Sequence, residues 1–266
     1  MPSVTVADRR IDYRWIGEEE PPPHSGGVAP TLIWLHEGLG SHDQWRDVPE
    51  RVAAATGTRA LLYSRYGYGR SERLAEARGV RYMHDEALIA LPALRNALGI
   101  ENPILVGHSD GASIALIHAG AGQWPVRGIV LMAPHVFVEP ESIAGIETAR
   151  DVYRATDLGK RLGRYHDDPD ATFWGWNDIW LAPAFRSWNI EEYLPGISCP
   201  ALLIQGEDDE YGTLAQLDAI ERQVAGPTER LVLPACGHSP HRDRPDETVE
   251  AISRFVARLL ASGGST

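Results

Sequence analysis

The serine at position 109 lies at the centre of a five-residue motif, G-H-S-D-G over residues 107–111, that is typical of a catalytic nucleophile. A short apolar run at 104–106 precedes the motif, and a stretch with a strongly apolar face follows it. A buried strand that ends in G-x-S-x-G and leads into a helix forms a strained turn, which directs the serine hydroxyl into a cleft. The flanking glycines fit such a turn because neighbouring backbone comes too close for a Cβ atom. The same letters can make an ordinary turn, but the strand–turn–helix context favours Ser109 as a nucleophile.

His238 is the candidate base for this serine. A serine hydroxyl is a weak nucleophile at neutral pH, so it needs a base within hydrogen-bond reach and an anion that orients the base. His238 follows the last apolar run and precedes the final helical segment, at the strand edge where α/β sheets place their ligands. His241 is the competing imidazole and forms an H-x-x-H pair with it. No further His or Cys cluster supplies a third ligand, so no metal site is predicted.

Four consecutive carboxylates at 207–210 supply the candidate acid. They cannot all be buried together, because like charges raise one another's pKa and desolvation of a carboxylate is costly. One carboxylate should therefore turn inward to the imidazole while the others face water. We predict Asp209 for this role, with Asp208 as the alternative.

An oxyanion hole needs two backbone N–H groups aimed at the developing negative charge. One should come from Asp110, the residue after the serine. The other should come from the turn at 36–40, where Gly38 is favoured over Leu39 as the donor. His36 in this turn is expected to be structural rather than a catalytic base.

The side chains of Glu37 and Asp110 are carboxylates close to this predicted site. A negative charge at a helix N-terminus is favoured electrostatically, so a structural role suffices for Asp110. If either carboxylate faces the cleft, it should disfavour anionic substrates.

Apolar runs that alternate with helical patterns position these residues. Continuous apolar strands separated by helices predict a mostly parallel sheet covered on both faces. Pro92 lowers the expected continuity of the second helix. Residues 17–30, rich in Glu, Pro and Gly, are expected to form an exposed loop. The expected strands are 3–7, 11–16, 31–36, 59–63, 104–106, 128–132, 201–205 and 230–233, and the expected helices are 43–55, 82–98, 110–121, 213–225 and 246–260.

One long interval between Met132 and Ala201 contains no strand pattern. That length is implausible for a bare loop in a compact domain and predicts an inserted, mostly helical cap. We expect a first core part at 1–134, the cap at 135–195 and a second core part at 196–266. Aromatic residues concentrate in the insertion, and some of them should line an apolar substrate chamber. The candidates for substrate binding are Trp174, Trp176 and Trp180.

Residues 31–262 resemble the α/β-hydrolase superfamily. The turn at 36–40 resembles its HG-type oxyanion loop, and 63–71 resembles its D-x-x-G-x-G-x-S segment. The motif around Ser109, the acid turn that ends at Asp209 and the loop that contains His238 complete the set in the order which that superfamily uses. The resemblance implies a mostly parallel eight-stranded sheet flanked by helices, a helical cap, and a Ser-His-Asp triad that needs no cofactor.

The charge and composition of the chain limit the classes of partner that it can bind. The net charge of −12 argues against a nucleic-acid or anionic-membrane surface, because polyanion binding needs clustered Lys and Arg. No apolar run approaches the roughly 20 residues that span a bilayer, and the N-terminal residues do not resemble a secretory signal. Cys199 and Cys236 are expected to be free thiols in a reducing cytoplasm. We expect a cytoplasmic monomer or homodimer that acts on a small molecule.

The resemblance implies a serine esterase or lactonase acting on a small to medium apolar substrate. Epoxide hydrolases and haloalkane dehalogenases of the superfamily use aspartate at the position of Ser109, so the serine argues against both. Hydrolysis of C–C bonds and other reactions of the same triad remain alternatives. A ligand-binding sensor with vestigial chemistry is a further alternative, because a fold alone does not fix function.

Overall fold

The computed structural model describes residues 2–17 and 30–262. The exposed loop predicted at 17–30 therefore lies almost entirely outside the described residues.

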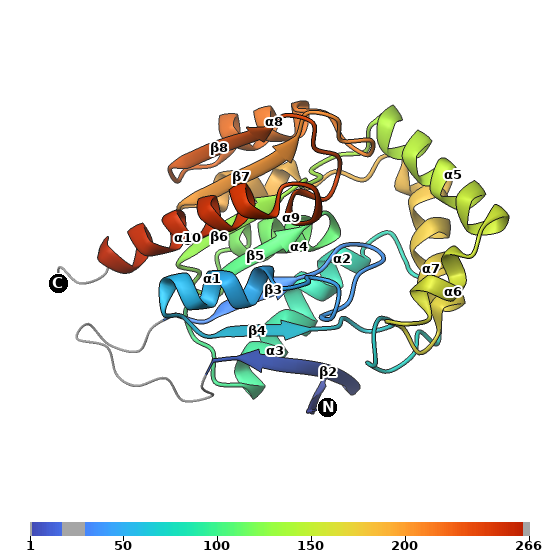
Figure 1. The fold of residues 1–266 in the computed structure, drawn as a ribbon, viewed down its shortest axis with the longest axis horizontal. Helices are drawn as coiled ribbons and strands as arrows, with labels where there is room; N and C mark the ends of the chain where they lie inside the picture. The colour runs from blue at the N-terminus through green and yellow to red at the C-terminus, as the bar shows by residue number, and fades with distance from the viewer. Residues whose placement is uncertain (1, 18–29, 263–266) are drawn as a thin grey trace.

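One eight-stranded sheet runs through the described part of the chain (Figure 1). Its spatial order is β1-β2-β4-β3-β5-β6-β7-β8, and only the β1–β2 and β2–β4 pairs are antiparallel. Every predicted strand is present, with ends that differ by at most two residues, and the predicted fold class is confirmed. The strands are β1 Ser3–Val6, β2 Arg9–Ile16, β3 Leu32–Leu35, β4 Ala60–Tyr63, β5 Ile104–His108, β6 Gly128–Met132, β7 Ala201–Gly206 and β8 Thr228–Leu233.

Helices cover both faces of this sheet. Helices α1 and α10 lie side by side on the front in Figure 1, and α3 and α4 lie behind. The core helices are α1 Val48–Thr56, α2 Tyr82–Asp85, the π-helical η1 Glu86–Ala90, α3 Leu91–Ala97, α4 Asp110–Gly120, α8 Ala215–Gln223, α9 Pro240–Asp243 and α10 Pro245–Ser262.

Two apolar clusters, one on each face of the sheet, form the core. Successive side chains of a strand point to opposite faces, so a fully buried strand is apolar throughout. In β3, Trp34 joins one cluster with Val52 of α1 and Phe255 of α10. Its neighbour Ile33 joins the other cluster with Ile114 of α4. Because both faces are buried, the central strands hold the loops at their carboxyl ends in fixed positions.

The predicted helix at 82–98 is continuous but irregular. A π-helical turn at Glu86–Ala90 lies between α2 and α3, and Pro92 is the second residue of α3. Proline lacks an N–H and its ring collides with the carbonyl four residues earlier, so a wider turn accommodates it without ending the helix. The helix predicted at 43–55 begins only at Val48, because residues 42–47 form turns.

The interval between β6 and β7 is helical, as its length predicted. It contains α5 Pro140–Ala155, α6 Leu158–Leu162, α7 Pro169–Leu181 and the short 3-10 helices η2 Pro183–Phe185 and η3 Glu191–Gly196. Helices α5, α6 and α7 stand beyond the carboxyl ends of the parallel strands (Figure 1). An isolated bridge pairs Phe137 with Asn189 at the base of this segment. The insertion thus leaves and re-enters the core at one place.

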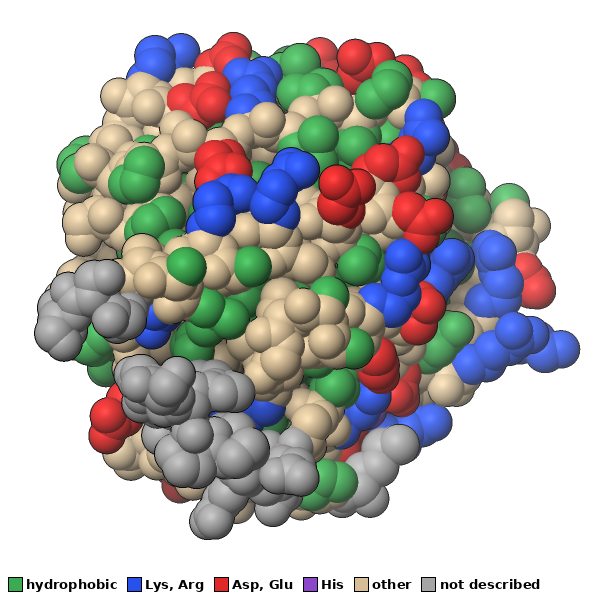
Figure 2. Space-filling model, turned by 60° about the vertical axis from the view of Figure 1, so that its left-hand side comes forward, with side chains coloured by type: hydrophobic (Ala, Val, Ile, Leu, Met, Phe, Trp, Pro, Cys, Tyr) green, Lys and Arg blue, Asp and Glu red, His purple; other side chains and the backbone are tan. Residues whose placement is uncertain are grey.

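Charges of both signs lie next to one another across the face shown in Figure 2. One surface ion pair, between Arg51 and Asp246 at 2.6 Å, joins α1 to the start of α10. Among the described helices, none is both long enough and apolar enough to cross a bilayer.

Candidate active site

Ser109 adopts the backbone conformation of a nucleophile turn. It lies between β5 and α4 with φ 53° and ψ −120°, a positive φ that is uncommon for a residue with a side chain. Close packing explains the neighbouring glycines. A Cβ on Gly111 would lie 1.9 Å from the carbonyl oxygen of Leu35, and one on Gly107 would lie 2.4 Å from the carbonyl oxygen of Gly111. Only glycine fits at these two positions, so the turn depends on them.

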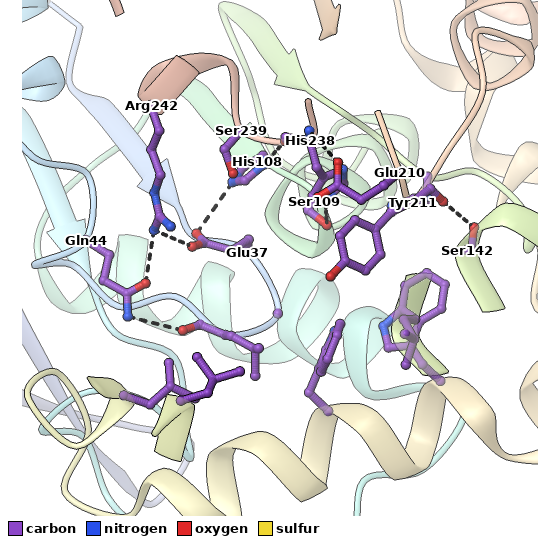
Figure 3. Close-up of a pocket in the computed structure, with 18 residues that line it drawn as sticks. Glu37, Gln44, His108, Ser109, Ser142, Glu210, Tyr211, His238, Ser239 and Arg242 are labelled. Atoms are coloured by element: carbon purple, nitrogen blue, oxygen red, sulfur yellow. Dashed lines mark hydrogen bonds and ion pairs between the residues drawn. The ribbon is translucent and has the colours of Figure 1, made fainter. Parts of the chain in front are cut away.

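A chain of hydrogen bonds joins the three predicted triad residues. Figure 3 shows its Ser109–His238 end. The Ser109 hydroxyl donates to Nε2 of His238 over 2.9 Å, and Nδ1–H of His238 donates to Oδ1 of Asp209 over 2.8 Å. The backbone N–H of Tyr211 also donates to Oδ1 over 2.9 Å, and the Gln205 amide donates to Oδ2 over 3.2 Å. The carboxylate is thus fixed from three sides.

The environment of this chain favours an ionised acid and a basic imidazole. Burial raises the pKa of Asp209, but the adjacent His238 and the Tyr211 N–H outweigh it, so that the pKa is lowered overall. Burial lowers the pKa of His238, but the negative charges of Asp209, Glu210 and Glu37 raise it overall above its ordinary 6.5. Such opposed shifts in a cleft are characteristic of catalytic acid–base pairs.

The structure separates the two alternatives that the sequence left open. Asp208 is exposed and contributes its backbone N–H to the Cys236 carbonyl, whereas the Asp209 side chain is only 2 % exposed. His241 is buried with its ring 5.0 Å from that of Trp45, and it makes no hydrogen bond to the described residues. His238, and not His241, therefore contacts Ser109, and Asp209, and not Asp208, contacts His238.

The two carboxylates near the oxyanion turn lie in different places. Asp110 does not face the cleft, because its side chain is fully buried and accepts hydrogen bonds from Tyr82 and Trp180. Glu37 does line the cavity, where Arg242 donates to it over 3.1 Å (Figure 3). Burial raises the pKa of Glu37, but His108 and Arg242 lower it well below its usual range.

The cavity beside Ser109 has a volume of about 250 Å³ and two unlike walls. Glu37, Gln44 and Arg242 form a connected polar wall, in which the Arg242 guanidinium donates to both of its neighbours. The insertion supplies five apolar side chains to the lining, besides the polar His135 and Ser142. These five form the apolar wall of the cavity and belong to Ile146, Leu158, Leu162, Trp176 and Trp180. Gly38 and Leu39 also line the cavity, beside the serine.

Trp174 is not part of this cavity, which corrects the prediction for one of the three tryptophans. It packs at the outer side of α7 against Phe173 and Tyr153, with the Arg154 guanidinium 5.3 Å from its ring. The reason is helix phase, since Trp176 and Trp180 are four residues apart and share one face. Trp174 projects from another face of the same helix.

Three residues that the sequence interpretation did not single out lie next to the triad. The ring of Tyr211 is 4.7 Å from that of His238, and the ring of His135 is 5.6 Å from it. Burial and the neighbouring His238 lower the pKa of His135 to about 3. Glu210 accepts a hydrogen bond from the His238 backbone N–H over 3.1 Å. Their position after β6 and β7, at the same strand edge as Ser109, is the signal that could have identified them.

His36 is structural, as predicted. Its Nδ1–H donates to the carbonyl oxygen of Glu37 over 2.7 Å, and Nε2 accepts from the backbone N–H of Arg65 over 3.0 Å. The ring is fully buried, and burial followed by the charge of Arg65 lowers its pKa well below 6.5. This neutral imidazole joins the turn after β3 to the loop after β4. As for metals, no group of three or more His, Cys, Asp or Glu side chains among the described residues is arranged to hold one.

Comparison with known proteins identifies the family. The model of the alpha/beta hydrolase family matches residues 32–251, and the chain belongs to this family. The match spans all of the motifs that carry the resemblance, from the turn after β3 to the His238 loop.

Relatives with known activities include both peptidases and esterases. A proline iminopeptidase of Saccharolobus solfataricus is 25 % identical and covers 88 % of this chain and 87 % of its own. A bifunctional esterase/perhydrolase of Acinetobacter calcoaceticus is 26 % identical, over 68 % of this chain and 75 % of its own. Among solved structures, an esterase from Exiguobacterium antarcticum superposes with a TM-score of 0.72 at 19 % identity, covering 96 % and 98 % of the two chains. The family therefore supports a hydrolase activity.

Proposed function

We propose that this protein is a serine hydrolase that cleaves a small to medium apolar carboxylic ester or lactone. In this mechanism, Ser109 Oγ attacks the carbonyl carbon while Nε2 of His238 accepts the hydroxyl proton. The backbone N–H groups of Gly38 and Asp110 stabilise the oxyanion. His238 then protonates the leaving alkoxide, and the acyl group stays on Ser109.

Hydrolysis of the acyl-enzyme completes the cycle. His238 accepts a proton from water, whose oxygen attacks the acyl carbon, and the same imidazole returns the proton to Ser109 Oγ as the acid leaves. Asp209 keeps the imidazole in the required tautomer and stabilises its protonated form.

The observation that carries this proposal is the hydrogen-bonded chain Ser109–His238–Asp209, at 2.9 and 2.8 Å, beside a cavity to which the insertion contributes five apolar side chains. The volume of about 250 Å³ suits a compact acyl or alcohol group. We further propose that residues 135–195 act as the cap over the site. The ionised Glu37 disfavours anionic substrates, although its pairing with Arg242 weakens this effect.

The direct test is the variant Ser109→Ala assayed with p-nitrophenyl esters. We expect residual turnover at least 10³-fold below wild type, as for other triads that lose the nucleophile. A fluorophosphonate probe should label wild type at Ser109 by peptide mapping and leave the variant unlabelled. Wild-type turnover in Ser109→Ala, with an intact fold by circular dichroism, would refute the proposal.

A second candidate is removal of an N-terminal residue from a peptide, the activity named for the Saccharolobus relative. The exposed Glu210 carboxylate lines the cavity, and among the described residues it accepts a hydrogen bond only from the His238 backbone N–H. This carboxylate could pair with a substrate ammonium group, which favours the second candidate. Proline p-nitroanilide and p-nitrophenyl acetate distinguish the two candidates. Esterase specificity predicts a kcat/KM for the ester that greatly exceeds that for the anilide, and the reverse ranking favours the peptidase.

A further inference from the structure

Two tryptophans of α7 contact the two residues from which the proposed oxyanion hole is built. Trp176 touches Gly38 and Trp180 touches Asp110. Residues four apart lie one above the other on a helix face, so a single face of α7 reaches both halves of the site. The insertion thus contacts the residues that bear the proposed donors, in addition to walling the cavity.

Trp180 contacts Asp110 through a buried hydrogen-bond network. Its indole N–H donates to the Tyr82 hydroxyl at 3.0 Å and to Oδ1 of Asp110 at 3.3 Å. The Tyr82 hydroxyl in turn donates to Oδ2 of Asp110 over 2.7 Å, and the Arg65 guanidinium lies 3.7 Å from that oxygen. A fully buried carboxylate depends on such partners, because the cost of removing it from water must be offset. The carboxylate of the residue after Ser109 is therefore fixed partly by α7.

Trp176 packs against Gly38, the residue that bears the other proposed oxyanion donor. A Cβ on Gly38 would lie only 2.1 Å from Nε1 of Trp176, so the indole rests against the glycine Cα. Any side chain at position 38 would displace either the indole or the turn. Trp176 is 7 % exposed, and this packing limits how far the turn at 36–40 can move.

We propose that α7 is a positioning element for the oxyanion hole, with Trp180 fixing Asp110 and Trp176 fixing Gly38. This inference rests on the proposed serine hydrolase function and extends it. It changes the role assigned to the two indoles, because a substrate wall acts on binding, whereas a positioning contact acts on the stabilisation of the transition state. Trp180 and Trp176 are positioning residues in this account.

Trp180→Phe tests the proposal, because it removes the N–H and keeps an aromatic ring. The matched control is Trp188→Phe in the same aromatic cluster, with ring centroids 6.0 Å from Trp180. The Trp188 N–H is buried and has no hydrogen-bond partner in the described chain. With p-nitrophenyl acetate, we expect kcat to fall about tenfold in Trp180→Phe with KM nearly unchanged, and the control to match wild type.

The affinity for a mimic of the tetrahedral intermediate is a second measurement. It should change if Trp180 positions the oxyanion hole and stay constant if Trp180 only supports the fold. A short-chain alkyl trifluoromethyl ketone forms a hemiketal with the serine and places its oxyanion in the hole. Its affinity should fall in Trp180→Phe by the same factor as kcat/KM. The affinity for the corresponding methyl ketone, bound without an oxyanion, should stay constant.

Tyr82→Phe is the second variant, in case Trp180→Phe folds poorly. It removes a donor to Asp110 and the main acceptor of Trp180 without altering the cavity wall. It should lower kcat in the same direction, and the double variant should lose less than the product of the two single losses.

The outcomes separate this inference from the proposed function. If wild type neither turns over the ester nor labels at Ser109, the proposed function fails and the inference fails with it. If wild type is active and Trp180→Phe keeps its kcat and mimic affinity, only the inference fails. A change confined to KM that grows with acyl-chain length also overturns the inference, since it would identify a substrate wall.

Discussion

His238 accepts one hydrogen bond from Ser109 and donates one to Asp209, which fixes the nitrogen that carries the proton in the neutral ring. Nδ1 must hold the proton so that Nε2 can accept another from the serine. Asp209→Asn would offer an amide N–H or a poorer acceptor at Nδ1 and favour the wrong tautomer. We expect kcat to fall by about 10⁴-fold.

The matched control for this prediction is Asp208→Asn, since Asp208 is exposed and the carboxylate that bonds His238 is that of Asp209. Its kcat should stay within about twofold of wild type, as for most surface substitutions. A larger loss in Asp208→Asn than in Asp209→Asn would reverse the assignment of the acid. Steady-state kinetics with p-nitrophenyl acetate measures both variants.

The pH profile tests the charge environment of His238. Burial lowers the pKa of this residue, but Asp209, Glu210 and Glu37 raise it above 6.5 overall. His238 must be neutral to accept the serine proton, so kcat/KM should rise with pH and reach half its plateau above pH 6.5.

Glu210→Gln isolates one of these charges while keeping an oxygen for the His238 backbone N–H. Removal of a nearby negative charge disfavours the imidazolium, so the midpoint of the acidic limb should move to lower pH. An unchanged or higher midpoint would contradict the proposed electrostatic contribution of Glu210. The measurement is kcat/KM as a function of pH for both proteins.

At the scale of elements, α6 supplies part of the apolar wall through Leu158 and Leu162. Leu158 is half-buried, so a larger side chain there can enter the cavity without disturbing the core. Leu158→Phe should leave p-nitrophenyl acetate turnover unchanged and reduce kcat/KM for the hexanoate by about tenfold. Trp174→Phe, outside the cavity, should keep the wild-type chain-length profile in the same series, and an altered profile would place Trp174 in the substrate path.

The elements were largely predictable because their signals are local. The central parallel strands are continuous apolar runs, and the motifs around Ser109 and Asp209 each follow one of them. The motif around His238 follows the shorter apolar end of β8, residues 231–233. The phase of α7 was not predictable in this way. Phe173, Trp174 and Trp176 are all large and apolar, so the hydrophobic pattern did not indicate which ring faces the site.

Contacts between distant segments were also beyond the sequence. Asp110 and Trp180 are seventy positions apart, and nothing near either residue indicates that they are hydrogen-bonded. The sequence predicts a structural role for Asp110 as a charge at a helix N-terminus, and Asp110 is indeed the first residue of α4. The sequence does not indicate its hydrogen-bond partners, Tyr82 and Trp180. His135 was missed because a single histidine after a strand carries no motif of its own.

At the scale of the whole molecule, burial lowers the pKa of several imidazoles and so favours their neutral form in the native state. His118 is fully buried, donates from Nδ1 to the carbonyl oxygen of Ala87 and accepts at Nε2 from Arg95, both over 2.7 Å. Burial lowers the pKa of His118 to about 4, and the charge of Arg95 acts in the same direction. In the unfolded chain this histidine regains its ordinary pKa and binds a proton more readily.

Acidification should therefore destabilise the protein. The unfolded state binds more protons than the native state below pH 6.5, so the free energy of unfolding falls as the pH decreases from 6.5 to about 4. His118 alone accounts for about 3 kcal/mol of this loss. Urea denaturation at a series of pH values measures it, in high salt to screen the change in net charge.

His118→Gln should reduce the pH dependence of the unfolding free energy, because glutamine does not titrate. The slope should not vanish, since His36, His135 and His241 are also buried with lowered pKa values. Equal slopes in the variant and wild type would show that His118 does not contribute to the acid sensitivity.

The bridge between Phe137 and Asn189 affects how freely the length of the segment between these two residues can vary. The two ends of the intervening segment are already held together, so lengthening it adds little to the entropic cost of folding. Exchange of that segment between relatives would leave the register of the sheet and the order of the triad untouched. A replacement would keep Tyr82 as a partner of Asp110, but it would have to supply again the contacts of Trp180 with Asp110 and of Trp176 with Gly38. The proposed positioning role of α7 would thus restrict such an exchange at these two contacts rather than along the whole insertion.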